Sequence, residues 1–186
     1  MSRLRADLVA DPAPVALDLG PGEAALVGVE AVGPLTGIGL CLLERRRHEV
    51  RLDGRRLDRY GLAGRVRRGL GVISGAPVAA DVSVLDQLAA VRGVAAAAAV
   101  LADAPLLARR GGDPAGILSG GERRVLAWLR CQLTRPRAVV LDAAGTGLDA
   151  DTLAWCQRVV EGWRAEGVAV VVRAGREEER AWAAPG

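Results

Sequence analysis

The feature that most constrains the fold is a run of four apolar residues ending in an acid, Ala138-Val-Val-Leu-Asp142. A strand that is apolar along its whole length is typical of a parallel sheet covered by helices on both faces. A helix-like stretch at 152–166 and a β-branched run at 168–172 follow it. This alternation of strand and helix predicts an α/β fold.

Earlier parts of the chain continue the alternation around a helix-rich stretch. The segments expected to be regular are strand 15–19 with the turn 20–22, a buried strand at 24–28, helix 33–43 with Pro34 at its first position, strand and turn 49–54, strand 69–74, helix formers at 84–108, and a helix from Ser119 to about Leu133. We therefore expect one domain over 1–186. Its core takes in about 1–75 and 119–186, and an inserted helical lobe takes in about 76–118.

Composition excludes several classes of protein. The three cysteines lie far apart, so neither a disulfide framework nor a zinc site is expected, and a reducing cytoplasm is the default. The apolar stretch 24–43 is interrupted by glycines and Pro34, which favours strand, loop and helix over a membrane span. A net charge of +3 from 25 basic and 22 acidic residues gives no argument for a nucleic-acid partner.

Smaller patterns predict structural roles. We expect the arginine run 45–47 with His48 to be a solvated helix end, with a basic binding patch as the alternative, and Glu177–Glu179 to be a solvated face. Trp128, Trp155 and Trp163, with Cys131 and Cys156, are expected to pack in the core or against a partner.

Ser119, with Glu122 three residues later, forms a capping-box pattern at the start of a helix. The free backbone N–H groups and the dipole of such a helix end favour an anion. An ordinary capped helix is the alternative. The run Leu118-Ser-Gly-Gly-Glu-Arg-Arg124 resembles the signature motif of ABC-type ATPases. In that family the motif meets the γ-phosphate of a nucleotide held by the opposite subunit. The resemblance thus assigns Ser119, Gly120, Gly121 and Glu122 to an ATP site in trans.

Two later segments support the resemblance. Ala138–Asp142 resembles a Walker B strand, whose terminal Asp142 would hold Mg²⁺ through water, and Gly147-Leu-Asp149 resembles the D-loop. The resemblance implies a P-loop NTPase-like ABC ATPase core, with ATP and Mg²⁺ as cofactors. It also implies a dimer with a second nucleotide-binding domain, a membrane-spanning transporter subunit as partner, and a cytoplasmic location that extends to the inner face of the membrane.

The segment that matches a P-loop departs from the family pattern. Gly28 and Gly33 frame it, and these two glycines would let the altered loop keep its shape. The lysine and hydroxyl positions of the pattern are Pro34 and Leu35, and Thr36 comes one place late. The chain contains no lysine, and Glu30 would repel a polyphosphate. We expect poor binding of ATP·Mg²⁺.

Three further departures affect hydrolysis. Ala143 stands where active members carry the catalytic glutamate, Arg173 where they carry the switch histidine, and Gly75 where they carry the Q-loop glutamine. Alanine has no group that accepts a proton from water. The resemblance therefore implies no catalytic residue in this chain.

Three hypotheses remain open from the sequence. The first is a pseudo-ATPase subunit that supplies its signature motif to an ATP site on a partner. The second is an active ABC transporter ATPase with an unusual P-loop. The third is a scaffold module that uses the fold without nucleotide. Whether the chain is an enzyme is left open.

Overall fold

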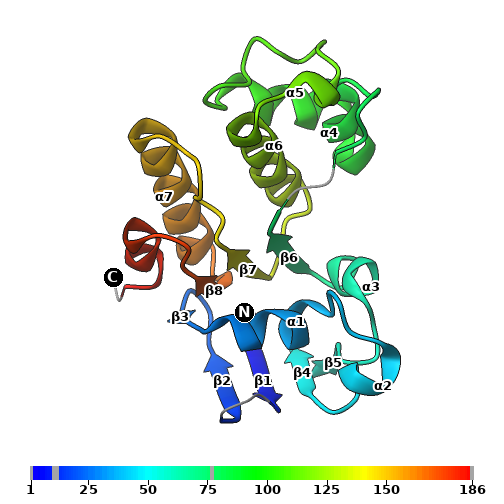
Figure 1. Ribbon diagram of the computed structural model, residues 1–186, viewed down its shortest axis with the longest axis vertical. Coiled ribbons are helices and arrows are strands. Elements are labelled where there is room, and N and C mark those ends of the chain that lie inside the picture. Colours follow the sequence, from blue (N-terminus) through cyan, green and yellow to red (C-terminus); the bar gives the residue numbers. More distant parts are fainter. Residues whose placement is uncertain (1, 10–12, 76–77, 185–186) are drawn as a thin grey trace.

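The computed structural model describes residues 2–9, 13–75 and 78–184 (Figure 1). The strands form two sheets, and the helices lie around and between them (Figure 1). The strands are β1 (Leu4–Leu8), β2 (Val15–Leu19), β3 (Ala24–Leu26), β4 (Glu49–Leu52), β5 (Arg55–Arg56), β6 (Leu70–Ile73), β7 (Ala138–Asp142) and β8 (Ala169–Arg173). The helices are α1 (Val29–Thr36), α2 (Leu42–Arg45), α3 (Leu62–Val66), α4 (Val84–Arg92), α5 (Val94–Ala102), α6 (Gly120–Leu133) and α7 (Ala150–Ala165), with 3-10 turns η1 (Ala115–Ile117) and η2 (Glu177–Ala183).

A four-stranded parallel sheet in the order β3-β8-β7-β6 carries the core. The four apolar residues of β7 are completely buried, as their composition predicts, because strands flank β7 on both sides and both faces are covered. The α/β fold is confirmed. The expectation of a buried strand at 24–28 is wrong, because β3 lies at the sheet edge and Leu26 is 45% exposed.

The second sheet is antiparallel, in the order β2-β1-β4-β5. Its strand β1 shows clean alternation, with Leu4, Ala6 and Leu8 buried and the residues between them exposed. Together with α1 and one face of the parallel sheet, this face of β1 forms one of the two hydrophobic clusters. Helix α1 therefore lies between the two sheets, with Ala31 and Leu35 completely buried there.

The other cluster joins the helices α4, α5 and α6 to the opposite face of the parallel sheet (Figure 1). The helix-forming stretch 84–108 is divided at Gly93, whose φ of 82° ends α4 before α5 begins. Trp128 lies at the centre of this cluster, stacked on Trp163 at 5.7 Å and edge-on to Trp155 at 6.1 Å. These tryptophans are core residues.

Within the described ranges, no helix has both the length and the apolar character that crossing a bilayer requires. The predicted helix at 33–43 is wrong, because α1 begins at Val29 and ends at Thr36, where Gly37 takes a left-handed conformation with φ 73°. The domain limits expected at about 75 and 119 stay a prediction, and residues 76–77 at that junction lie outside the described part of the chain.

Candidate functional site

Asp142 ends β7 and faces Arg173, its neighbour in register at the end of β8. The Arg173 Nε donates to Asp142 Oδ1, and the two side chains are 28% and 21% exposed. The carboxylate expected to hold Mg²⁺ thus already has a cation within the chain. A guanidinium in direct contact with a carboxylate competes with a metal ion for the same oxygens.

The other groups of a magnesium site are also missing. Thr36, the nearest hydroxyl to the expected position, is buried and donates from Oγ1 to Val32 O at 2.7 Å. Within residues 2–9, 13–75 and 78–184, no group of three or more His, Cys, Asp or Glu side chains is arranged for a metal. The residues present therefore do not fit Mg²⁺ at this end of the sheet.

The segment expected to form the phosphate-binding loop is a helix instead. Gly28 is the N-cap of α1, and the carboxylate of Glu30 fills the space beside Gly28. Ala31, Val32 and Leu35 face the core, at helical spacing. The prediction that the altered loop keeps its shape is wrong, because burial of this apolar face favours a helix over an open loop.

The positions of the missing phosphate ligands lie inside the molecule. Pro34 and Leu35 are both buried between the two sheets, and Gly33 lies within α1 rather than at the end of a loop. A side chain placed at 34 or 35 thus points into protein rather than toward a ligand.

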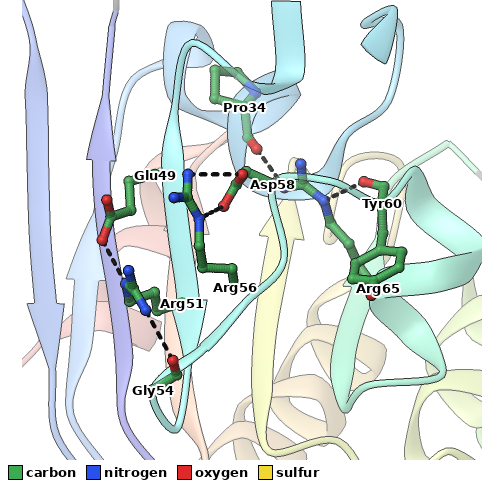
Figure 2. A network of polar contacts seen from close by, with 8 residues as sticks. All are labelled: Pro34, Glu49, Arg51, Gly54, Arg56, Asp58, Tyr60 and Arg65. Carbon is green, nitrogen blue, oxygen red and sulfur yellow. Dashed lines mark hydrogen bonds and ion pairs between the residues drawn. The ribbon is translucent and has the colours of Figure 1, made fainter. Parts of the chain in front are cut away.

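A buried arginine fixes the other end of α1. The guanidinium of Arg65, a residue of α3, donates to Pro34 O, Leu35 O and Tyr60 O (Figure 2). Burial lowers the pKa of Arg65 to about 10. A cation at the C-terminal carbonyls of a helix is electrostatically favourable. No sequence pattern indicates this contact, because Arg65 is one of many arginines in its segment.

The loop after β7 is held by several hydrogen bonds. Ala143 has φ 47°, its N–H donates to Arg173 O at 2.8 Å, and its carbonyl accepts from Arg124. The carbonyl of Ala144 accepts from the indole N–H of Trp128 at 3.1 Å. The side chain of Ala143 itself has no group that accepts a proton.

Glu179 joins this loop to the one after β8. Its Oε1 accepts from Gly145 N at 2.7 Å and its Oε2 accepts from Gly175 N at 2.6 Å, and the side chain is completely buried. The prediction of a solvated face at 177–179 is wrong for Glu179. Trp182, three residues later, packs edge-on against Trp128 at 5.4 Å and turns this side of η2 inward. Glu179 and Trp182 are three residues apart, and this spacing is the sequence pattern that could have indicated that Glu179 faces the core.

The signature-like segment forms a regular helix start. Ser119 Oγ accepts from Glu122 N at 3.2 Å, and Glu122 Oε2 accepts from Ser119 N at 2.8 Å, so the predicted capping box is confirmed. Glu122 also accepts from Arg110. Burial alone would raise the pKa of Glu122, but the bonds from Ser119 and Arg110 lower it below the ordinary value. The Glu122 carboxylate is thus occupied within the chain.

Two residues at the start of α6 face solvent. Ser119 and Gly120 are exposed, and a Cβ at Gly120 would meet nothing within 4 Å. Gly121 lies beside the D-loop-like segment, since its Cβ would come 3.4 Å from Gly147 O. The two motif-like segments therefore share one surface.

Asp149, in the D-loop-like segment, caps α7. Its Oδ1 accepts from Thr152 N at 2.8 Å, and this bond lowers the pKa of the exposed carboxyl. The nucleotide roles of Asp149, Ser119, Gly120, Gly121 and Glu122 stay predictions.

Comparisons with known proteins bear on the fold. No protein-family model matches the chain. Over 60 residues, which are 32% of this chain and 12% of the relative, the chain is 35% identical to the ribose import ATP-binding protein RbsA of Rhodococcus jostii (strain RHA1). The match thus takes in only a small part of that relative's length.

Solved structures match almost the whole chain. A nucleotide-free ATP-binding cassette from an ABC transporter superposes with a TM-score of 0.72 at 16% identity, covering 95% of this chain and 82% of its own. A cassette in its ADP conformation gives 0.71 at 14% identity, covering 98% and 85%. An ATP-binding subunit of an ABC transporter gives 0.72 at 19% identity, covering 93% and 80%. The chain has the fold of ABC-transporter ATP-binding cassettes, which confirms the resemblance drawn from the motifs.

Proposed function

We propose that this chain is a non-hydrolytic subunit of an ABC-type ATPase assembly, which offers its signature-like segment to an ATP site on a partner. The observation that carries the proposal is α1. Where an ATP site needs an open loop of backbone N–H groups and a lysine, this chain has a buried helix with Pro34 and Leu35 at the ligand positions. Its own site therefore lacks both the shape and the charge that a bound polyphosphate requires.

The end of the parallel sheet supports the same conclusion. Arg173 neutralises Asp142, and Ala143 has no group to orient a water. Metal binding and general-base chemistry are thus both absent from the arrangement of these described residues. Under this proposal, the chain contributes to ATP hydrolysis only through a site on a partner subunit.

The surface that faces solvent supports a role in trans. The start of α6 exposes Ser119 and Gly120, and a Cβ added at Gly120 would meet nothing of the described chain within 4 Å. The missing side chain at Gly120 leaves room for a group from outside the chain to approach the helix N-terminus. A partner's nucleotide fits this requirement, since the helix N-terminus favours an anion. Because the Glu122 carboxylate is internally bonded, Ser119 and the backbone of Gly120 and Gly121 would make the contact.

The partners follow from the proposal. A second nucleotide-binding domain would hold ATP and Mg²⁺, and a membrane-spanning transporter subunit would complete the assembly. This places the chain at the cytoplasmic face of a membrane, without a nucleic-acid role.

The test compares two substitutions in the complex isolated through an affinity tag on this chain. Ser119→Arg puts a bulky side chain where the partner's nucleotide would lie, and we expect it to abolish ATP hydrolysis by the complex. Asp142→Ala affects only this chain's own inert site and should leave the rate within about twofold. Equal losses from both changes, or a complex without any ATPase activity, would contradict the proposal.

A further inference from the structure

The positive charge of the chain is concentrated in one region. Residues 45–68 contain ten arginines against three acids, a net charge of +7, whereas all other residues contain fifteen arginines against nineteen acids, a net charge of −4. We call residues 38–68, which include α2, β4, β5 and α3, the basic lobe. These elements lie together at one corner of the molecule, on the side away from α7 (Figure 1).

The acids of the basic lobe are already used by internal partners. Glu49 pairs with Arg51 and Asp58 with Arg56 (Figure 2). Asp53 pairs with Arg137, the residue before β7, and Glu44 accepts from Cys41 N at 2.7 Å. In contrast, Arg46, Arg47, Arg59 and Arg67 are exposed, and none makes an ion pair or side-chain hydrogen bond with the described residues. The excess charge of the lobe therefore faces solvent.

These exposed arginines flank one junction between α2 and α3. Arg45 Nη1 donates to Leu40 O at 2.8 Å and lies against Gly61, where a Cβ would come within 3.3 Å of it. The Arg68 guanidinium lies 3.5 Å above the ring of Tyr60. The end of α2 and the start of α3 thus meet near Tyr60 and Gly61, where Arg45 and Arg68 make their contacts.

The buried side of the junction adds further charge. Arg65 lies under it, and its Nη2 is buried without a hydrogen-bond partner among the described residues, as is Nε of Arg45. Neither guanidinium has a carboxylate bound to it. The junction therefore has positive groups both inside and outside that form no ion pair with the described residues.

Apolar side chains lie beside this charge. Leu43 is 75% exposed, and Leu42 and Ile38 are also exposed. Exposed aliphatic side chains next to a cationic cluster are typical of a surface that meets the interface of a bilayer. Guanidinium groups bind phosphate oxygens in pairs, and their stems extend along apolar surface.

We infer that the basic lobe docks on a bilayer that contains anionic phospholipids, with arginines on the headgroup phosphates and Leu42 and Leu43 in the interface. Single-stranded nucleic acid fits the lobe less well. Binding of bases relies on exposed aromatic platforms, and Tyr60, the one Phe, Trp or Tyr in the lobe, has its ring covered by Arg68. The inference goes beyond the proposed function and does not depend on nucleotide.

Co-sedimentation with vesicles tests the inference on the purified full chain. We expect no binding to phosphatidylcholine vesicles, and binding when about 30% of the lipid is phosphatidylglycerol, because each surface arginine gains about fivefold in affinity from an anionic bilayer. Raising the salt concentration from about 0.1 M to 1 M should release the chain. The paired substitution Arg46→Glu and Arg47→Glu should weaken binding by at least about tenfold.

The control has the same change of charge outside the lobe. Arg109→Glu with Arg158→Glu alters two exposed arginines elsewhere and should change vesicle binding by less than about threefold. Equal weakening by the two pairs would overturn the inference, as would absence of binding to the anionic vesicles. Thermal melting checks that each variant is folded.

A second pair of changes separates a bilayer from nucleic acid. Leu42→Ser with Leu43→Ser keeps every charge and should weaken vesicle binding several-fold, while any binding of an oligonucleotide stays the same. If the leucine changes have no effect on vesicles and the oligonucleotide binds more tightly than the vesicles, the lobe is a nucleic-acid surface and the inference is wrong. None of these measurements involves ATP, so their failure leaves the proposed function untouched.

Discussion

At the scale of single residues, the chemistry at the end of β7 depends on which cation faces Asp142. Arg173 takes that place, in a pair that is neither fully exposed nor fully buried. A double-mutant cycle of Asp142→Asn and Arg173→Gln, measured by urea unfolding, should give a coupling energy of about 1–2 kcal/mol, between the values of surface and buried pairs. The exposed pair of Arg3 and Asp18 serves as the control and should show no measurable coupling. Absence of coupling between Asp142 and Arg173 as well would mean that the pair does not form in solution.

His48 gives a second prediction at this scale, since it is the single histidine of the chain. Burial lowers the pKa of His48 below 6.5, and the charges of Arg65 and Arg47 lower it further. Its Nδ1 also accepts from Val9 N at 3.1 Å, which requires an unprotonated nitrogen. His48 therefore contributes stability above pH 6.5, and the contribution is lost as the pH falls through the folded-state pKa. An NMR titration of the imidazole checks this, and a pKa at or above 6.5 would contradict the structure.

At the scale of elements, η2 fastens the loops that follow β7 and β8 through Glu179. Glu179→Ala leaves two buried N–H groups without an acceptor and should lower the free energy of unfolding by about 2–4 kcal/mol. Glu179→Gln keeps one acceptor oxygen and should have a smaller effect. The neighbour Glu178 is exposed, and Glu178→Ala should leave the urea midpoint unchanged. Equal effects of the alanine substitutions at 178 and 179 would show that the loops do not depend on Glu179.

The sequence predicted some helices and strands accurately and others not, and the reasons are physical. The strand β7 and helix α6 were predicted nearly to the residue, because continuous apolar character and a capping box act locally. Helix α1 was not, because the framing glycines suggested a loop while tertiary burial and the distant Arg65 favour a helix. Strand β1 was overlooked although Leu4, Ala6 and Leu8 alternate with charged residues, a period-two pattern that was visible.

For the candidate site, the sequence showed which residues are present but did not predict how they are arranged in space. The absence of lysine and of a glutamate at 143 follows from the residues alone. The pairing of Arg173 with Asp142 depends on the strand order, which places β8 beside β7 although a helix and two loops separate them in the chain. Likewise, Glu179 is buried because η2 packs against the sheet (Figure 1), and a tertiary contact of this kind cannot be predicted from the local sequence.

On the scale of the whole molecule, two different surfaces lie on one scaffold. The starts of α6 and α7 lie on one surface, where Gly121 approaches Gly147 and Arg176 donates to Leu148 O at 2.8 Å. The basic lobe, which includes strands β4 and β5 of the antiparallel sheet, forms another corner (Figure 1). Helix α1 occupies the segment where the family resemblance predicted a phosphate loop. Under the proposed function, the molecule contacts partners on its outside and binds no nucleotide at its own site.

Titration calorimetry of the isolated chain with ATP and Mg²⁺ distinguishes a closed nucleotide site from a working one. We expect no saturable heat up to about 1 mM ATP, which corresponds to a binding free energy weaker than about −4 kcal/mol. Saturable binding with a micromolar Kd would contradict this expectation, because α1 would then have to open into a working phosphate loop without a lysine.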